Sequence, residues 1–284
     1  METTIQKIDL HIHTTMSDGT DTPEEIIGKV RDAGIKIFSV TDHDAINGCT
    51  MIMGALRDGD PVFIPGAEFN SRDEGGRYHI LGYGFDPEAP SINGIVEAAH
   101  ELRMKKVHAR LDFLRKELGF DLPEDEIAKL LELNNPGKPH IANLLVRYGY
   151  AENKEQGIEY IDRKHFKSEY LHPKDVITAI RDAGGIPVLA HPPYGSGNEI
   201  IVKEELSERV ERLIGYGIEG LEGYYSGFTN VLRDEVISLA VRHDLFVTAG
   251  SDYHGSNKLV VLGDTGLDVE APADGLCRFL SKIL

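Results

Sequence analysis

Residues 22–44 read TPEEIIGKVRDAGIKIFSVTDHD and hold a helix, a strand and a polar turn in that order. Thr22-Pro23-Glu24-Glu25 forms a capping box with proline at the first helical position, and Gly34 is a typical helix terminator. The largely apolar strand Ile35–Val40 follows, and the polar residues 41–44 come directly after it. This order predicts a well-bounded helix, then a buried strand, then a turn rich in side chains that can do chemistry.

A second segment repeats this pattern. Residues 173–184, PKDVITAIRDAG, match the earlier helix and are followed by the apolar strand Ile186–Ala190 and by His191. Any buried strand that follows an amphipathic helix converges on such a pattern, so one echo does not indicate a repeat protein. It does place His43 and His191 at equivalent strand ends.

Short β-branched segments alternate with helical patterns on both sides of a central region, which is typical of a parallel α/β sheet or barrel. We predict strands at Ile5–Leu10, Ile35–Val40, Val62–Ile64, His79–Tyr83, Ile186–Ala190, Ile218–Leu221 and Leu245–Ala249.

The alternation stops between about Ser91 and Leu171, where the pattern turns helical. Helices are expected at Ile92–Leu118, Glu124–Leu133 and Ile141–Tyr148. The chain therefore divides into a first α/β part (residues 1–90), a helical insertion or cap (residues 91–171) and a second α/β part (residues 172–284). Helical spacing places Arg103, Lys106 and Arg110 near one face, which is either a solvated surface or a phosphate contact.

Composition narrows the class of protein. The 284 residues are 41% hydrophobic and 27% charged, as in ordinary globular proteins, and the formal net charge is −17. Such a charge disfavours a long, nonspecific grip on nucleic acid. There is no signal-peptide pattern and no apolar run long enough for a membrane span, and the two cysteines form no CxxC motif. We expect a cytoplasmic protein without a membrane partner.

Two histidines one residue apart, His11 and His13, directly follow the first predicted strand. Alternate side chains of an extended backbone point the same way, so both imidazoles can reach one metal ion. Asp18 lies where a loop can turn back over them, although alone it is typical of a turn aspartate.

Further polar side chains follow the other predicted strands: His43, Glu68, His191, Asp252 and His254. Each has a structural explanation when taken alone, but five of the twelve histidines lie just beyond strand ends, each near an acidic residue or another such histidine. In parallel α/β barrels these ends meet on one side, where active sites lie. His79 is the exception, because it opens its predicted strand. His100, His108, His165, His172 and His243 are interpreted as structural.

Imidazole and carboxylate ligands without thiolate favour Mn²⁺, Zn²⁺ or Fe²⁺ over Ca²⁺. Nine ligands are too many for one ion. With Glu68 as a bridge, two ions could lie roughly 3.5–4 Å apart and share a hydroxide suited to attack on phosphorus.

In this order, the motifs H-x-H…S-D-G, T-D-H-D, a following glutamate, A-H-P and G-S-D-x-H resemble those of the polymerase and histidinol phosphatase (PHP) family of metal-dependent phosphoesterases. They span almost the whole chain and are specific together, although each is weak separately. The resemblance implies a distorted (β/α)7 barrel with a small helical insertion and three divalent metals, with a metal-bridging hydroxide as the nucleophile. It implies one metal on His11, His13, Glu68 and Asp252, a second on Glu68, His79 and His191, and a third on Asp18, His43 and His254.

Within the family, the insertion and Gly137-Lys138-Pro139-His140-Ile141-Ala142 are similar to the branch of 3′,5′-nucleoside bisphosphate phosphatases and 5′-3′ exoribonucleases. That branch usually has arginine at the position of Lys138 and often another at the position of Asn143. The lysine keeps the positive charge but cannot make the bidentate contact with phosphate that arginine makes. We nevertheless expect Lys138, His140 and Arg103 to contact substrate.

The leading hypothesis is hydrolysis of a phosphomonoester on a small nucleotide, either a 3′,5′-bisphosphate or the 5′ end of a short oligoribonucleotide. Catalysis is expected to depend on Asp18, His43, Glu68, His191, Asp252 and His254. Histidinol phosphate or another small phosphomonoester is the nearest rival substrate. Two other classes stay open: an amidohydrolase, for which no suitable strand-end lysine is present, and a catalytically silent nucleotide-binding module.

Overall fold

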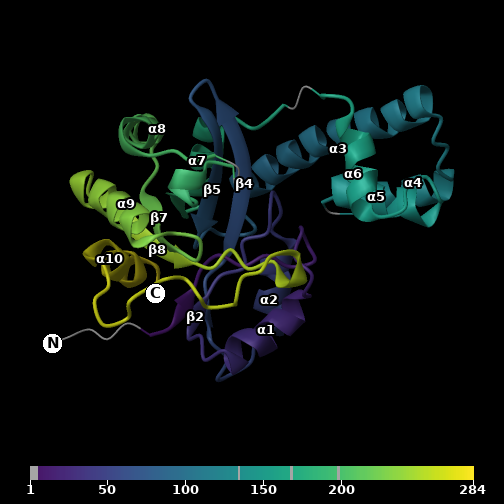
Figure 1. The fold of residues 1–284 in the computed structure, drawn as a ribbon. Coiled ribbons are helices and arrows are strands. Elements are labelled where there is room, and N and C mark those ends of the chain that lie inside the picture. Colours follow the sequence, from purple (N-terminus) through teal and green to yellow (C-terminus); the bar gives the residue numbers. More distant parts are fainter. Residues whose placement is uncertain (1–5, 134, 167–168, 197–198) are drawn as a thin grey trace. The chain divides into compact units, whose positions relative to one another are not determined.

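The computed structural model describes residues 6–133, 135–166, 169–196 and 199–284, and it divides the chain into two compact units (Figure 1). The first unit comprises Met1–Val96 and Leu171–Leu284, and the second comprises Glu97–Tyr170. The helix α3 (Pro90–Leu118) begins in the first unit and continues into the second.

The first unit contains a short parallel sheet near the N-terminus. Its strands are β1 (Ile8–Asp9), β2 (Ile37–Phe38) and β3 (Val62–Phe63), with β2 in the centre. They agree with three predicted strands, except that Ile5 lies outside the described residues. Isoleucine, valine and phenylalanine side chains around these strands, such as Ile26, Phe38 and Ile52, are fully buried in one core cluster.

A second sheet of five strands contains β4 (Gly66–Asp73), β5 (Gly76–Tyr83), β6 (Ile186–Leu189), β7 (Gly220–Tyr225) and β8 (Phe246–Gly250) in that order. The strand β5 pairs antiparallel with both β4 and β6, whereas β6, β7 and β8 are parallel. The parallel strands therefore end at one edge of the sheet, as the alternation of elements predicts.

The hairpin β4–β5 corrects the placement of two predicted site residues. Glu68 does not follow a strand through a loop but lies inside β4, and His79 does not open its strand but lies in the middle of β5, opposite Asn70. The sequence of β4, GAEFNSRD, has no β-branched residue and so gives no strand signal of its own. Pairing with β5 creates the strand.

The predicted α/β class is confirmed. The described strands make two separate sheets that are not closed, so the expected (β/α)7 barrel is not confirmed.

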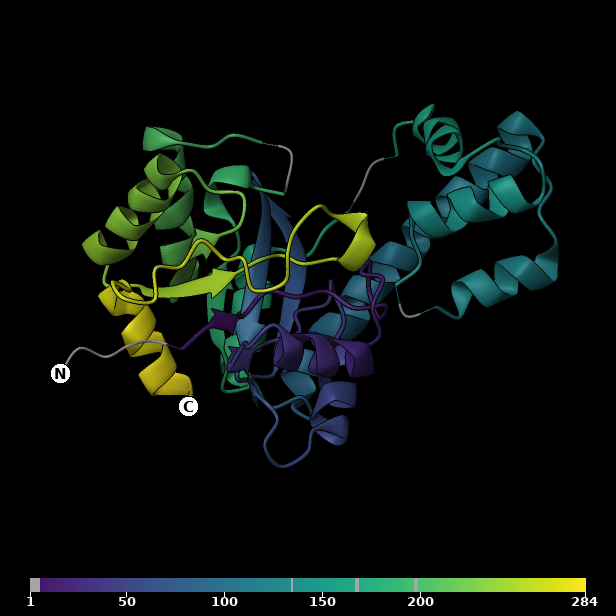
Figure 2. The same ribbon diagram turned by 60° about the horizontal axis from the view of Figure 1, so that its bottom comes forward.

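Among the described residues, six α-helices belong wholly to the first unit. They are α1 (Pro23–Asp32), α2 (Asn47–Ala55), α7 (Pro173–Asp182), α8 (Lys203–Tyr216), α9 (Asn230–Arg242) and α10 (Asp274–Ile283). Figures 1 and 2 show them on the outside of the strands, and α7, α9 and α10 pack on the five-stranded sheet. The predicted capping box of α1 is present: Glu25 N donates to Thr22 Oγ1 over 3.2 Å, and Thr22 N donates to Glu25 Oε2 over 2.8 Å.

The second unit is helical. After α3 it contains α4 (Glu124–Leu131), α5 (Lys138–Arg147) and α6 (Lys154–Asp162), packed around a core that includes Val107, Leu114 and Ile141. The helix α6 was not predicted, and α5 begins three residues earlier than Ile141, the expected start. Within the described residues, none of the helices combines the length and apolar character required to traverse a lipid bilayer.

Candidate metal centre

Glu68 is the centre of a buried cluster of imidazoles and carboxylates in the first unit. Its side chain is 1% exposed. Its Oε1 lies 3.0 Å from His79 Nδ1 and 3.3 Å from His191 Nε2. Its Oε2 faces three further imidazoles, those of His11, His13 and His43, at 3.4, 3.3 and 3.0 Å. The two oxygens of one carboxylate thus face two different sets of nitrogen atoms.

The first group surrounds Glu68 Oε2. The Nε2 atoms of His11 and His13 lie 3.1 Å apart, and they lie 3.5 and 3.3 Å from Asp252 Oδ1. The H-x-H motif therefore places both rings against the same two carboxylates, as the alternation of an extended backbone predicts.

The second and third groups lie beside the first. His43, Glu68 and His79 form one set of converging ligand atoms, and His191 joins it through Glu68. Asp18 lies 3.2 Å from His254 Nε2, and His13, Asp18, His43 and His254 form another set. His43 contacts both sets, through Nδ1 towards Glu68 and through Nε2 towards Asp18. All nine residues singled out in the sequence, including His79, lie in this one cluster.

The spacing of these atoms fits metal coordination. Two ligands that each lie about 2.0–2.1 Å from one Zn²⁺ are roughly 2.9–3.4 Å apart, and the separations within the first group are 3.1–3.5 Å. Glu68 Oε2 is also buried and accepts no well-aligned hydrogen bond from the described residues. A buried carboxylate oxygen without such a bond is costly unless a cation neutralises it. The residues present therefore fit divalent cations.

The charge interactions within the cluster also indicate that its carboxylates require positive charge nearby. Burial favours the uncharged form of Glu68, but the His43, His79 and His11 side chains outweigh it and hold its pKa well below the usual range. Burial likewise disfavours the charged form of His43, yet Glu68 and Asp18 raise its pKa to about 9. Glu68 and Asp18 thus create a negative field at the His43 ring, whereas burial outweighs the carboxylates at His79 and His254 and lowers the pKa of both.

Two of the proposed ligands have an unusual backbone conformation. His191 has φ 29° and Asp252 has φ 58°, in the region that non-glycine residues rarely adopt. Hydrogen bonds hold both: His191 N donates to Glu222 Oε2 over 2.7 Å, and Asp252 N donates to His11 O over 2.8 Å. Such conformations persist only where the surroundings impose them, and they cluster at functional sites.

A layer of buried carboxylates supports the ligands, and our sequence analysis did not assign it. Glu222 is fully buried, and its Oε1 lies 2.9 Å from His11 Nδ1. This contact leaves Nε2 of His11 as the nitrogen that faces the other ligands, an arrangement typical of metal-binding histidines. The available signal was a charged residue directly after the predicted strand Ile218–Leu221.

Asp9 and Asp42 fix the neighbouring loops. Asp9 accepts hydrogen bonds from Ser251 N, at 2.9 Å, and Ser251 Oγ, at 2.6 Å, and so joins the first strand to the segment before Asp252. Asp42 accepts from Thr14 N at 2.8 Å and from Ser17 Oγ at 2.6 Å, next to Asp18. The contacts of Asp42 thus account for part of the density of polar groups after Val40.

The three predicted substrate contacts lie in the second unit. Lys138 is the first residue of α5 and forms an ion pair with Asp162, and His140 Nδ1 accepts a hydrogen bond from Gly137 N over 3.2 Å. Arg103 lies on α3. The two helices contribute to one group of cations, because burial and the charges of Arg110, Arg103 and Lys138 lower the pKa of Lys106.

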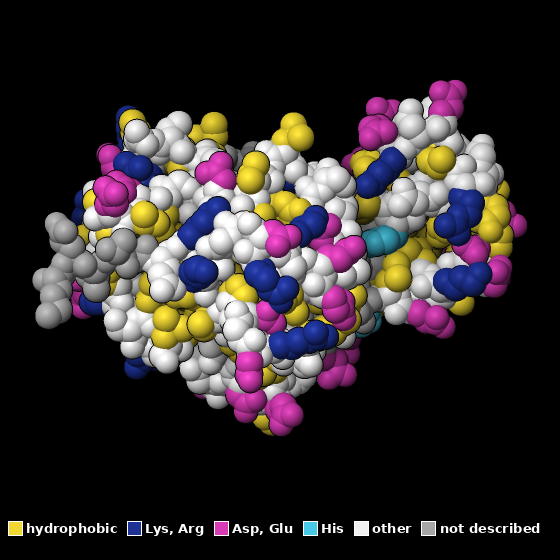
Figure 3. Space-filling model, turned by 90° about the horizontal axis from the view of Figure 1, so that it is seen from below, with side chains coloured by type: hydrophobic (Ala, Val, Ile, Leu, Met, Phe, Trp, Pro, Cys, Tyr) yellow, Lys and Arg dark blue, Asp and Glu magenta, His cyan; other side chains and the backbone are white. Residues whose placement is uncertain are grey.

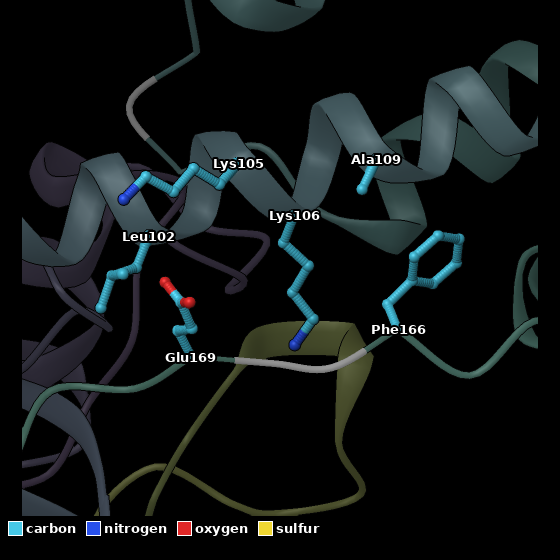
Figure 4. Close-up of a pocket in the computed structure, with 6 residues that line it drawn as sticks. All are labelled: Leu102, Lys105, Lys106, Ala109, Phe166 and Glu169. Atoms are coloured by element: carbon cyan, nitrogen blue, oxygen red, sulfur yellow. The ribbon is translucent and has the colours of Figure 1, made fainter.

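A pocket of about 290 Å³ lies in this unit, and Figure 4 shows the residues that line it. Lys106 points from α3 into the space between Glu169 and Phe166, and its Nζ lies 5.4 Å from the centre of the Tyr170 ring. Arg110 is 7% exposed, and its Nε has no hydrogen-bond partner among the described residues. The cationic face that helical spacing predicted is therefore partly buried rather than fully solvated.

The cluster in the first unit, with imidazoles and carboxylates that converge on shared positions, defines a metal-dependent hydrolase. The chain belongs to the PHP domain family, whose family model matches residues 9–219. The resemblance proposed from the motifs is thereby confirmed.

Relatives and a solved structure agree with this class. The chain is 28% identical to the phosphoribosyl 1,2-cyclic phosphate 1,2-diphosphodiesterase of Eggerthella lenta, over 87% of this chain and 94% of that protein. It is also 28% identical to the 3′,5′-nucleoside bisphosphate phosphatase of Chromobacterium violaceum, over 95% and 94%. A crystal structure assigned as a metal-dependent phosphoesterase from Bifidobacterium adolescentis superposes with a TM-score of 0.80 at 27% identity, covering 98% and 97% of the two chains. The protein is a metal-dependent phosphoesterase.

Proposed function

We propose that this protein hydrolyses a phosphomonoester of a small nucleotide, either a 3′,5′-bisphosphate or the 5′ end of a short oligoribonucleotide. The observation that carries the proposal is the convergence of nine imidazole and carboxylate side chains on Glu68 and its neighbours. The similarity to a nucleoside bisphosphate phosphatase along almost the full chain supports the nucleotide.

The ligand atoms support three divalent cations. His11, His13, Glu68 and Asp252 would hold the first, Glu68, His79 and His191 the second, and Asp18, His43 and His254 the third. The absence of thiolate from this set favours Mn²⁺, Zn²⁺ or Fe²⁺. Bound there, the cations would polarise the phosphoryl group and favour ionisation of an attacking water molecule.

The chain's own residues position the reaction. We assign catalytic roles to Asp18, His43, Glu68, His191, Asp252 and His254, which line a single cavity of about 340 Å³. Asp18 has a 47% exposed side chain, whereas that of Glu68 is buried, so Asp18 lies towards solvent and Glu68 at the base. A phosphoryl group that enters this cavity would meet the cations that these residues hold, and they would stabilise the negative charge of the transition state.

We propose that Arg103, Lys138 and His140 of the helical insertion contact the substrate. The partly buried cations of α3 and α5 support this role, since such groups favour a phosphate or another anion. The pairing of Lys138 with Asp162 leaves part of that charge neutralised.

A distorted (β/α)7 barrel is the architecture we propose for the first unit. Two connections between the sheets support it: Leu10 N donates to Ala249 O over 2.9 Å beside β1 and β8, and a parallel bridge joins His43 to Glu68.

The two cysteines, Cys49 and Cys277, are free thiols, which fits the reducing cytoplasm.

The test is a substrate screen with purified protein supplied with Mn²⁺, Zn²⁺ or Fe²⁺. Adenosine 3′,5′-bisphosphate, a 5′-phosphorylated oligoribonucleotide, histidinol phosphate and a cyclic amide would be compared, with metal content measured on the same samples. We expect phosphate release from the bisphosphate or the oligonucleotide at rates well above those for the other two.

If the protein prefers histidinol phosphate, the proposed nucleotide substrate is wrong and histidinol phosphate takes its place. If only the cyclic amide is turned over, the phosphoesterase assignment is overturned. Tight nucleotide binding without hydrolysis under all three metals would identify a silent binding module instead.

A further inference from the structure

The cavity in front of the metal ligands contains one strong cation. Its volume is about 340 Å³, and among the described residues that line it Lys258 is the sole lysine or arginine. The three carboxylates of the cluster, Asp18, Glu68 and Asp252, line the same space. No catalytic or ligand role assigned above uses Lys258.

The position of Lys258 is fixed by the loop that precedes it. This residue follows the short 3₁₀ helix η2 (Gly255–Asn257), which begins directly after His254. Asn257 Nδ2 donates to Asp18 O over 2.7 Å, and Ser256 N donates to Thr20 Oγ1 over 3.0 Å. The loop is thus tied to the segment that carries Asp18, and the lysine is held beside the cluster.

Lys258 has hydrogen-bonding capacity to spare. Its Nζ lies 2.6 Å from Asp252 Oδ2, which also accepts a hydrogen bond from Tyr225 OH over 2.9 Å. The other oxygen, Oδ1, faces His11 and His13. Because Tyr225 already orients Asp252, the lysine is not needed for that purpose alone. An ammonium group has three donors, so two remain for a ligand oxygen while the contact to Asp252 persists.

We infer that Lys258 binds a nonbridging oxygen of the phosphoryl group to be hydrolysed and thereby favours a dianionic phosphomonoester over a monoanionic phosphodiester. The inference rests on the proposed function and names the class of ester that the same site prefers. A terminal phosphoryl group carries more negative charge than a diester, so the ammonium group of Lys258, whose side chain is 41% exposed at the wall of the cavity, attracts the dianion more strongly than the monoanion.

The test compares binding of two anions to metal-loaded protein. Inorganic phosphate, which is mostly dianionic at about pH 8, and dimethyl phosphate, a monoanion, would be titrated by calorimetry into wild type, Lys258→Met and Lys258→Arg. Lys282→Met, at an exposed position in α10, is the matched control. Metal content is measured for every sample.

We expect Lys258→Met to weaken inorganic phosphate about tenfold or more, to weaken dimethyl phosphate much less, and to keep its full metal content. Lys258→Arg should recover most of the phosphate affinity, and Lys282→Met should match wild type. Equal losses for both anions, unchanged phosphate affinity, or loss of metal from Lys258→Met would each overturn the inference, the last by making Lys258 a positioning residue for Asp252.

Hydrolysis of adenosine 3′,5′-bisphosphate by the same wild-type preparation separates the two claims. If the wild type binds phosphate through Lys258 but hydrolyses none of the esters, the proposed function fails while the contact holds. If it hydrolyses the bisphosphate but Lys258→Met binds phosphate normally, the inference alone fails.

Discussion

Both oxygens of Glu68 lie against imidazole nitrogens at the bottom of a cavity. Burial of a carboxylate costs several kcal/mol in real proteins, and a purely structural role would be served as well by an apolar side chain. The surrounding imidazoles offset part of this cost, by their charge when protonated and by N–H donation when neutral. The residue is therefore explained by the cations that the cluster can hold rather than by stability of the fold.

The ligand assignment can be checked with two alanine substitutions. Asp252→Ala removes a carboxylate that faces His11 and His13, and we expect turnover to fall at least about 10³-fold because a metal position loses its charge balance. His243→Ala alters the C-cap residue of α9, whose Nε2 lies 3.9 Å from Glu211 Oε1 and belongs to none of the ligand sets, and should leave turnover nearly intact. Steady-state kinetics under saturating metal measure both, and equal effects would contradict the assignment.

Glu222 supplies a second test at the residue scale. The substitution Glu222→Gln keeps the shape of the side chain but removes the charge that orients His11 and holds His191 N. We expect metal affinity or turnover to fall by about 10–100-fold, as for other groups that support metal ligands.

Competition with a chelating dye measures the metal affinity of this variant. Glu204→Gln, at an exposed position in α8, is the control and should resemble wild type. If Glu222→Gln also resembles wild type, Glu222 does not support the site.

At the scale of elements, close approach between strands places the first ligands. The end of β8 passes so near the first strand that a Cβ atom on Gly250 would lie 2.2 Å from His11 Cβ and 2.6 Å from Glu222 Oε1. Only glycine allows this approach, because any side chain would displace the histidine or its supporting carboxylate.

Gly250→Ala is therefore expected to lower metal occupancy and turnover by more than about tenfold, and to destabilise the first unit through a steric clash. Gly28→Ala is the matched control, because a Cβ atom at this position in α1 meets no neighbouring atom within 4 Å. In a helix this second change should stabilise by up to about 1 kcal/mol. Metal analysis and thermal unfolding distinguish the two, and normal metal occupancy in Gly250→Ala would show that the strands can separate at no cost.

The β4–β5 hairpin has a separate role. It carries Glu68 and His79 on paired strands, so this carboxylate and its neighbouring imidazole are held by backbone hydrogen bonds rather than by a loop. Sites built on strands are more precise than sites on loops. This placement suits a residue that must face two groups of ligands at once.

On the scale of the whole molecule, the charge of the protein surface differs from the local charge of the candidate metal site. The net charge is −17, and Figure 3 shows lysine and arginine side chains interspersed with aspartate and glutamate over the face it presents. This pattern does not favour a long polyanion. A small phosphorylated substrate requires only the local charge of the metal-loaded cavity.

Metal removal should affect the stability of the protein as well as its activity. A ligand that binds the folded state at about 100 times its Kd adds roughly 2.7 kcal/mol, which corresponds to a shift in Tm of roughly 5–10 °C for a unit of this size. We expect a chelator to lower Tm by this amount and added Mn²⁺ or Zn²⁺ to restore it. Differential scanning calorimetry of wild type and Glu68→Gln measures the effect, and an unchanged Tm would contradict metal binding by the folded protein.

The sequence alone predicted the α/β class, the bounds of α1 and the nine side chains that the structure brings together in one cluster, because these depend on local signals. Caps and apolar periodicity reflect the preferences of short segments, and ligands at strand ends follow from the chain direction of parallel strands. The motifs added His79, which the strand pattern placed poorly.

Tertiary structure decided what depends on pairing between distant segments. The strand β4 exists because β5 pairs with it, and Glu222 supports the site because β7 brings it to His11, 211 positions away in the chain. Lys258 likewise enters the cavity through contacts of its loop with Asp18 and Thr20. None of these residues has a local pattern that distinguishes it from a surface or strand-end charge, so only the packed fold reveals its role.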